Sequence, residues 1–311
     1  MKTSQDNPDA NQLGAGVSLE QLLRAVTLSG YPLQRVVAQQ LLRNFSVMEE
    51  WGYIDRESKE HRTLDVFAFR NLRESENLWV SLALLVECKR SELPYVFFQA
   101  AAPKLPYDFP SVVGLGGKQL ELHKPGVGSR SVSGAQFLKL HDTDFVAAGP
   151  PISSAFARAE RKGKDLDLSG GVPFNHVVLP LLSARHHFAE IQKGIRGSGK
   201  VSACVALCAC VLDAPMICVA GGPEAPELSL TPWVRVVRQE AAQDRQWVST
   251  QHHVVDFVHR AFLGRFVEVH ALRFAEEFCI RAVKSQELLR DGRGTVPDWD
   301  NWTLAELRAV T

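Results

Sequence analysis

Two apolar segments with charged residues near their ends constrain the fold of this chain more than any other feature. The segment TLDVFAF contains one acid, Asp65, and the segment LALLVECK ends in Glu87, Cys88 and Lys89. Both are short and rich in residues that β-strands favour, and side chains alternate between the two faces of a strand. Glu87 and Lys89 are therefore expected to share one face, with Cys88 on the other. A neighbouring strand can place Asp65 beside them.

The expected group of two carboxylates and one ammonium indicates a particular chemistry. Charged groups at the ends of apolar strands are costly to remove from water unless ion pairing or a metal compensates them. Carboxylate oxygens suit Mg²⁺ or Mn²⁺, and an adjacent lysine suits the negative charge that develops when water attacks a phosphate. The pattern is typical of metal-dependent phosphodiester cleavage. A salt-bridge network of Asp65, Glu87 and Lys89 with no catalytic role is the alternative.

The composition is that of an ordinary globular protein and does not indicate strong non-specific binding of nucleic acid. The chain has 311 residues, of which 45% are hydrophobic, and its 35 Lys and Arg balance 35 Asp and Glu. Non-specific DNA binding usually depends on an overall basic excess, so any binding here would depend on a local patch. One candidate patch consists of Arg185, Lys193, Arg196 and Lys200.

The cysteines and the apolar segments indicate a protein of a reducing compartment. The six cysteines lie mostly in apolar runs and the N-terminus has no signal-peptide pattern, so a cytoplasmic location is expected. Residues 203–220 are long and apolar, but Asp213 and Pro215 interrupt them. Two buried strands are therefore predicted there, and no membrane span. The three cysteines of the first strand would share one face and pack in the core.

Turn and helix signals divide the rest of the chain. We expect a disordered polar tail at 1–16, one elaborated domain at 17–290 with its motif core at 31–100, and a C-terminal tail with a short helix at 291–311. Residues 157–171 are charged and contain glycine, so a mobile surface segment is predicted. Helices are predicted near 18–28, 33–43, 175–192 and 267–289, and strands near 47–55, 62–69, 79–88, 95–98, 201–220 and 232–238. This order predicts an α/β or mixed α+β class with a central mixed sheet flanked by helices.

A known family shares this order of motifs. A helix begins near Gln34, the run Arg62-Thr63-Leu64-Asp65-Val66 follows on a strand, and Val86-Glu87-Cys88-Lys89 ends the next strand. Residues 33–98 thereby resemble the PD-(D/E)xK nuclease superfamily, with its restriction-endonuclease-like fold, and within it the Mrr-like branch. Gln34 stands where members often have a helix carboxylate, and Leu64 replaces the proline of the nominal motif.

The resemblance implies a role for each motif residue. Asp65 and Glu87 would hold Mg²⁺ or Mn²⁺, helped by the backbone carbonyl of Cys88. Lys89 would orient or deprotonate the attacking water and stabilise the charged transition state. Gln34 would orient that water or a metal ligand.

The function implied is Mg²⁺-dependent hydrolysis of DNA, or of RNA, by an endonuclease of restriction or defence against foreign DNA. The candidate contacts to nucleic acid are Arg62, Arg196 and Lys200. Cutting both strands would require two active sites, so a homodimer or a partner protein of a defence system is expected. The alternative is a catalytically inactive member that binds nucleic acid or a protein, which the neutral charge and Gln34 favour.

Two other patterns have better structural explanations. Residues 194–200 have the glycine and lysine spacing of a P-loop, but Val201 follows instead of Ser or Thr, and the predicted order is helix then strand. A loop from helix to strand is therefore predicted. The histidine pairs at 186–187 and 252–253 cannot both point one way, so surface or interface positions are predicted for them.

Overall fold

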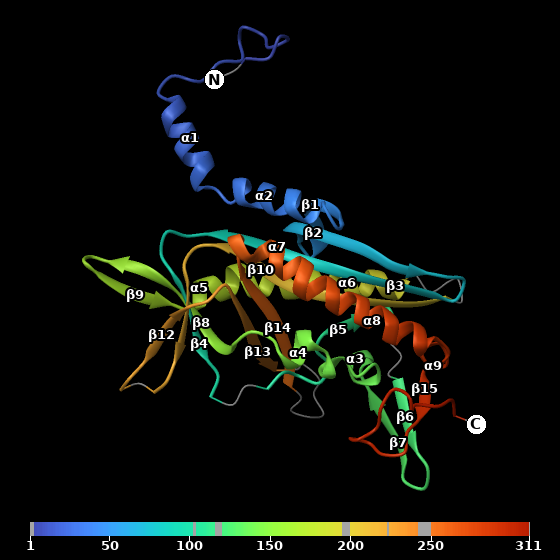
Figure 1. Ribbon diagram of the computed structural model, residues 1–311. Coiled ribbons are helices and arrows are strands. Elements are labelled where there is room, and N and C mark those ends of the chain that lie inside the picture. Colours follow the sequence, from blue (N-terminus) through green and yellow to red (C-terminus); the bar gives the residue numbers. More distant parts are fainter. Residues whose placement is uncertain are drawn as a thin grey trace.

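The fold is a large mixed sheet with helices packed against both of its faces (Figure 1). The computed structural model describes residues 3–101, 104–115, 120–194, 200–222, 224–241 and 250–310. The twelve strands of the sheet in these ranges are β1 (Ser46–Ile54), β2 (His61–Glu74), β3 (Leu78–Arg90), β4 (Tyr95–Gln99), β5 (Ser111–Val113), β8 (Ile152–Lys162), β9 (Asp165–Ser169), β10 (Val201–Asp213), β11 (Met216–Ala220), β12 (Glu227–Leu230), β13 (Trp233–Ala241) and β14 (Thr250–His259). The predicted mixed α+β class, with a mixed sheet flanked by helices, is confirmed.

Strand β10 lies at the centre of this sheet. The strand order is β1-β2-β3-β10-β14-β13-β8-β4-β11-β12, with β5 also beside β10 and β9 beside β8. β10 runs parallel to both β3 and β14, and its side chains from Ser202 to Leu212 are all buried. A strand covered on both faces is a continuous apolar run, without alternation. The two strands predicted from 203–220 are therefore confirmed as β10 and β11.

The helices begin where the sequence signals place them. α1 starts at a capping box in which Ser18 and Gln21 exchange hydrogen bonds, and α2 has Pro32 in its first turn. No helix in the described ranges has the length and apolar character needed to cross a membrane. The α-helices are α1 (Leu19–Leu28), α2 (Tyr31–Leu41), α3 (Gly134–Phe137), α4 (Asp144–Ala147), α5 (Gly171–Pro173), α6 (Leu179–Gly194), α7 (Leu263–Arg265), α8 (Leu272–Lys284) and α9 (Gln286–Asp291), with π-helical turns at Phe174–Val178 and Phe266–Ala271.

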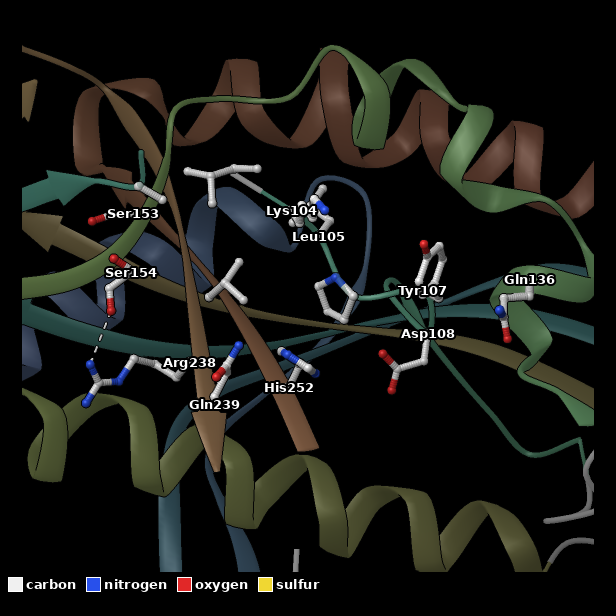
Figure 2. A pocket seen from close by; sticks show the side chains of 14 residues that line it. Lys104, Leu105, Tyr107, Asp108, Gln136, Ser153, Ser154, Arg238, Gln239 and His252 are labelled. Atoms are coloured by element: carbon white, nitrogen blue, oxygen red, sulfur yellow. Dashed lines mark hydrogen bonds between the residues drawn. The ribbon is translucent and has the colours of Figure 1, made fainter. Parts of the chain in front are cut away.

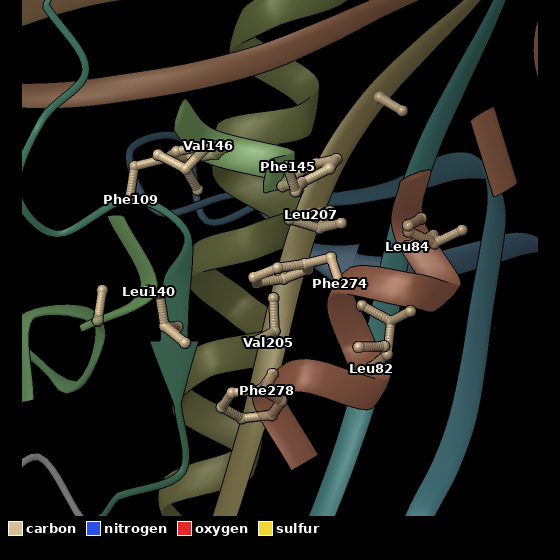
Figure 3. Close-up of a cluster of buried hydrophobic side chains, with 14 of the residues drawn as sticks. Leu82, Leu84, Phe109, Leu140, Phe145, Val146, Val205, Leu207, Phe274 and Phe278 are labelled. Atoms are coloured by element: carbon tan, nitrogen blue, oxygen red, sulfur yellow. The ribbon is translucent and has the colours of Figure 1, made fainter. Parts of the chain in front are cut away.

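Two hydrophobic cores form, one on each face of the sheet. The first core packs α2 and α8 against β3 and β10, and Figure 3 shows Phe274 and Phe278 of α8 beside Val205 and Leu207 of β10. The second core packs α6 against the opposite face of the same strands. Even-numbered residues of β3, such as Leu84, belong to the first core, and odd-numbered ones belong to the second. Glu87 and Lys89 therefore leave the sheet on the α6 side.

The segment 157–171, predicted to lie at the surface, consists mainly of an exposed regular hairpin of β8 and β9. β9 pairs with β8 in an antiparallel register, and Lys162 and Asp167 form an ion pair on the hairpin. β9 lies at an edge, with Leu166 and Leu168 exposed. The charged side chains remain in water there, and the backbone still pairs, so a polar composition did not prevent strand formation.

The C-terminal residues join a second, three-stranded sheet. β15 (Arg293–Thr295) pairs with β6 (Leu120–Lys124), which pairs with β7 (Gly128–Val132). The short helix predicted in this tail was wrong, because residues 304–306 form a turn. Glu306 accepts a hydrogen bond from the Thr303 amide, as a capping box requires, but Arg308 then pairs in extended conformation with Thr295. This bridge ends the turn before a helix can continue.

The N-terminal residues lie at one end of the molecule. Residues 3–17 contain turns and neither helix nor strand, and they are mostly exposed. Figure 1 shows α1 and the residues before it leading away from the sheet. α2 is the first helix whose side chains, Leu33, Val37 and Leu41, enter the first core.

Candidate metal centre

Strands β2 and β3 separate at the site, and Asp65 fills the gap between them. Their antiparallel ladder ends at the pair Val66–Val86. Beyond it, the Cys88 amide donates a hydrogen bond of 2.7 Å to Oδ2 of Asp65. The side chain thus replaces the backbone acceptor that a continued ladder would supply, because a buried amide must find a partner. Asp65 is thereby fixed beside the end of β3.

A local change in the pleat accompanies this separation. Leu64 and Phe67 both belong to the second core whereas Val66 belongs to the first, so the alternation of faces along β2 shifts by one residue at Asp65. On β1, Glu50 lies between the register pairs on either side of Asp65 and has φ of 51°, in the left-handed region. Such a backbone conformation costs roughly 1–3 kcal/mol at a residue other than glycine. The paired strands therefore depart from regular geometry at the acid that the sequence singled out.

The three predicted site residues lie together. Nζ of Lys89 is 2.6 Å from Oε2 of Glu87 and 4.0 Å from Oδ2 of Asp65. The Glu87 side chain is 5% exposed, whereas those of Asp65 and Lys89 are 25% and 30% exposed. The group is therefore a half-open ion cluster with a net charge of −1 when all three residues are ionised.

Burial dominates the electrostatics of the cluster. It raises the pKa of Glu87 to about 7, against the lowering effect of Lys89, and the charge of Asp65 adds to the rise. Burial alone would lower the pKa of Lys89, but Glu87 and Asp65 outweigh it and hold that pKa above its ordinary value. Lys89 is thus an ammonium at neutral pH, and Glu87 is poised between its acid and carboxylate forms.

The metal-free protein is expected to lose stability as the pH rises toward the Glu87 pKa. The folded-state pKa of about 7 exceeds the ordinary 4.5, so between these values the folded chain binds the proton more tightly than the unfolded chain does. The free energy of unfolding therefore falls as the pH rises across this window, by roughly 3 kcal/mol at most, because one pKa unit is worth about 1.4 kcal/mol. Lys89 does not offset this, since its contribution is lost only above its ordinary pKa of 10.5.

Denaturant unfolding across that pH window, in the presence of a chelator, measures the effect. The fall should be absent in Glu87→Gln and present in Glu160→Gln, whose exposed side chain pairs with Arg158 on β8. Equal pH slopes for wild type and Glu87→Gln would show that Glu87 is not the buried acid.

The donor atoms of the cluster fit Mg²⁺ in type. Asp65 and Glu87 each present a carboxylate oxygen within 4.0 Å of one Lys89 nitrogen, and Cys88 lies between Glu87 and Lys89 in sequence. The residues that the structure describes contain no group of three or more His, Cys, Asp or Glu side chains that could hold a metal. Two carboxylates are nevertheless a usual protein contribution to a Mg²⁺ site, because this ion keeps several waters and takes further oxygens from substrate phosphates.

Gln34, predicted to orient the attacking water or a metal ligand, makes no direct bond to the cluster among the described residues. It is buried on α2, whose first turn faces the end of β3: a Cβ added to Gly30 would lie 4.0 Å from the Cys88 carbonyl oxygen. Within the part of the chain that the structure describes, no hydrogen bond joins Gln34 to Asp65, Glu87 or Lys89. Gln34 is therefore buried on the face of the sheet that α2 covers, and Glu87 and Lys89 leave the other face.

The three predicted nucleic-acid contacts are not brought together. Arg62 lies three residues before Asp65 on β2, about 10 Å along the strand. Lys200 precedes the pair Val201–Leu78 at the start of β10, whereas Glu87 is nine residues further along β3, roughly 30 Å away. Lys200 also forms an ion pair of 2.9 Å with Glu74. Arg196 lies outside the described residues.

Other basic residues converge with Arg62 on the α6 side of the sheet. Arg56 follows β1, Arg185 lies on α6, and with Arg62 they line a cleft of about 250 Å³. Arg185 was noted in the sequence only as part of a basic run, and Arg56 was not singled out. His253, predicted at a surface or interface, is instead buried and 2.8 Å from Arg185. This cleft forms where α6 packs beside β2 and the turn before it, which are far from α6 in sequence. No local sequence pattern could therefore indicate it.

A larger cavity lies elsewhere in the molecule. It has a volume of about 1320 Å³, and Figure 2 shows side chains of β8, β13, β14 and the segment 104–108 around it. Its described lining contains one carboxylate, Asp108, and Arg238 there donates a hydrogen bond to the Ser154 carbonyl oxygen. Asp65, Glu87 and Lys89 do not line it. A single carboxylate makes this cavity a weaker candidate for a metal than the cluster at β3.

The cysteines near the cluster do not offer a nucleophile. Cys88 and Cys210 are buried, and burial raises the pKa of both thiols above the ordinary value. Cys210 pairs in register with Glu87 and belongs to the second core, as predicted from the apolar run. A thiol with a raised pKa is uncharged at neutral pH and reacts slowly.

No protein-family model matches the chain, and neither a search of curated proteins nor a search of solved structures found a similar protein. The case for a function therefore rests on the residues and the geometry of the cluster.

Proposed function

We propose that the chain is a Mg²⁺-dependent nuclease of the PD-(D/E)xK kind, with a restriction-endonuclease-like core and its active site at Asp65, Glu87 and Lys89. One observation is the main support. The two carboxylates and the ammonium that the motif requires, 22 to 24 residues apart in sequence, meet at one point where β2 and β3 separate. The order α2, β1, β2, β3 also follows the order of the motif, and α6 then leads to β10, parallel to β3.

Each side chain has a distinct role in this proposal. Asp65 and Glu87, with the Cys88 carbonyl, would hold Mg²⁺, which when bound polarises a non-bridging phosphate oxygen. Lys89 holds the attacking water in line with the phosphorus and offsets the negative charge of the transition state. The pKa of Glu87, at about 7, allows this carboxylate to shed its proton near neutral pH when a cation is close. Gln34, where an acid is often found in this superfamily, would orient the attacking water or a metal ligand.

A second candidate is a module that binds without cleaving. It is favoured by the short contact of 2.6 Å between Lys89 and Glu87, which neutralises one of the two carboxylates, and by Gln34 in the place of an acid. In that case the cluster would only stabilise the end of the sheet. Metal titration and cleavage assays separate the two candidates, because only the nuclease needs both properties.

Incubation with supercoiled plasmid or single-stranded DNA, with Mg²⁺ or Mn²⁺, tests the proposal directly. The wild-type protein should nick or linearise the plasmid or degrade the single strand, and a chelator should prevent this. Absence of cleavage by a folded protein that binds Mg²⁺ would instead support the non-cleaving module.

Asp65→Asn is expected to weaken Mg²⁺ binding by at least about tenfold, because it removes one of two charged ligands and tenfold corresponds to 1.4 kcal/mol. Isothermal titration with Mg²⁺ or Mn²⁺ measures the change. Asp167→Asn, on the exposed β9, is the control and should bind as wild type does. A titration curve for Asp65→Asn that overlays the wild-type curve would exclude Asp65 as a ligand.

A further inference from the structure

A basic cleft lies between the β1–β2 turn and α6, on the same side of the sheet as the candidate metal centre. Three guanidinium groups reach it from three elements: Arg56 from the turn, Arg62 from β2 and Arg185 from α6. Leu179 and Leu182 of α6 provide apolar walls, and the volume of about 250 Å³ suits a group of a few heavy atoms. Convergence of side chains from separate elements distinguishes this cleft from a scattered basic surface.

Acids compensate Arg62, which lies 3.6 Å from Glu60 and 4.0 Å from Asp55, but in the described part of the chain they leave the other two guanidinium groups without an ion pair. Among the described residues, neither Arg56 nor Arg185 forms an ion pair with a carboxylate. The carboxylate of Asp55 is 4.0 Å from Arg62 and already accepts hydrogen bonds from the amides of Glu57 and Ser58. These bonds, that of the Ser58 amide above all, lower the pKa of Asp55 to about 2. Asp55 therefore holds the turn in shape and is engaged before any ligand arrives.

The charge of Arg56 also affects the pKa of His186, a histidine that lines the cleft. Burial and then the charge of Arg56 lower the pKa of His186, and Lys193 and Arg185 lower it further, whereas Glu190 opposes them. Burial is the largest cause of this lowering, and the nearby guanidinium groups only add to it.

We infer that this cleft binds a phosphoryl group of a nucleic acid, next to the phosphodiester that Asp65, Glu87 and Lys89 would hydrolyse. Guanidinium groups match phosphate oxygens by charge and by paired hydrogen bonds, and three of them around one point can contact several oxygens of one group. A carboxylate ligand would leave part of that donor set unused.

The cleft and the cluster are adjacent through Tyr53. This buried side chain feels charges of both: burial and then Glu87 of the cluster raise its pKa to about 12, and Arg62 of the cleft opposes them. Tyr53 also pairs in register with Arg62, three residues before Asp65. A strand of nucleic acid with one phosphate in the cleft would thus place a nearby phosphate at the cluster. Only the identity of the ligand as nucleic acid depends on the proposed nuclease function; the anion site itself does not.

Binding of a fluorescent single-stranded oligonucleotide, with a 5′-phosphate or a 5′-hydroxyl, tests the inference when metal is removed by a chelator. Arg185→Gln and Arg56→Gln should each weaken binding by about tenfold or more, since a charge-assisted hydrogen bond is worth about 1.5–3 kcal/mol and 1.4 kcal/mol is tenfold. Arg161→Gln removes the same charge from the exposed end of β8 and is the matched control. Inorganic phosphate should compete with the oligonucleotide for wild type and not for Arg185→Gln.

The two oligonucleotides identify the source of the phosphoryl group. Tighter binding of the 5′-phosphorylated strand, lost in Arg185→Gln, identifies a terminal phosphate, and equal binding of both strands, weakened equally by Arg185→Gln, identifies an internal one. If both cleft variants bind as Arg161→Gln does, the inference is wrong. Because no turnover is measured, a protein that binds through the cleft but never cleaves would contradict the nuclease proposal alone. Arg56 is exposed, so its variant remains informative if Arg185→Gln does not fold.

Discussion

Lys89→Met is expected to reduce cleavage by about 10²–10³-fold or more while the protein remains folded and still binds Mg²⁺. Loss of one group that stabilises transition-state charge typically costs this much in rate. Methionine keeps the aliphatic stem and removes the ammonium that lies 2.6 Å from Glu87 and 4.0 Å from Asp65. Folding should survive because Glu87, with a pKa of about 7, can take up a proton when its partner is removed. Plasmid cleavage and Mg²⁺ titration on the same samples measure the two properties.

A control variant shows whether a loss of cleavage comes from the position of Lys89 or only from the loss of one positive charge. Lys162→Met removes an equal charge from the exposed β8–β9 hairpin and should cleave as wild type does. The titration should be run about one pH unit above the Glu87 pKa of about 7, so that both carboxylates are ionised in each variant. Cleavage by Lys89→Met at the wild-type rate would remove Lys89 from the mechanism. Loss of folding instead would favour the reading of the cluster as a structural salt bridge.

The candidate site could be predicted from sequence because Asp65, Glu87 and Lys89 lie on two consecutive, well-patterned strands. The apolar runs predicted β2 and β3, and the alternation along β3 correctly predicted that Glu87 and Lys89 share a face. A neighbouring strand was expected to place Asp65 beside Glu87 and Lys89, and Oδ2 of Asp65 does lie 4.0 Å from Nζ of Lys89. The separation of β2 from β3 could not be foreseen, since it depends on a pleat shift that no residue type demands.

The parts that escaped prediction depend on contacts between distant segments. β14 was not predicted, because the polar His252, His253 and Asp256 interrupt its apolar residues. Its polar groups are satisfied from elsewhere: Arg185 of α6 contacts His253, and Arg235 of β13 pairs with Asp256. Similarly, the basic cleft joins a turn near residue 56 to a helix residue some 130 positions later. Local composition has no information about such partners.

Asp256→Ala is expected to destabilise the protein by about 3–5 kcal/mol, because it leaves the charge of Arg235 buried without a partner. The Arg235 and Asp256 side chains are 0% and 2% exposed, and Nε of Arg235 lies 2.8 Å from Oδ1 of Asp256. Asp256 also accepts a hydrogen bond from the Trp233 indole, and the guanidinium lies 4.5 Å from the centre of the Phe145 ring. Denaturant unfolding in a chelator measures the loss without any contribution from metal binding.

Burial, and not the length of the ion pair, should decide the size of this effect. The exposed pair of Arg35 and Glu49 is shorter, at 2.6 Å, yet Glu49→Ala should cost no more than about 1 kcal/mol, since water and salt screen it. The double variant Arg235→Met/Asp256→Leu should be more stable than Asp256→Ala, because no buried charge remains and the apolar side chains can pack among Phe109, Phe145 and Trp233. A cost for Asp256→Ala no larger than that for Glu49→Ala would mean that water reaches Arg235. In that case β13, β14 and α4 would not exclude water from the Arg235 guanidinium.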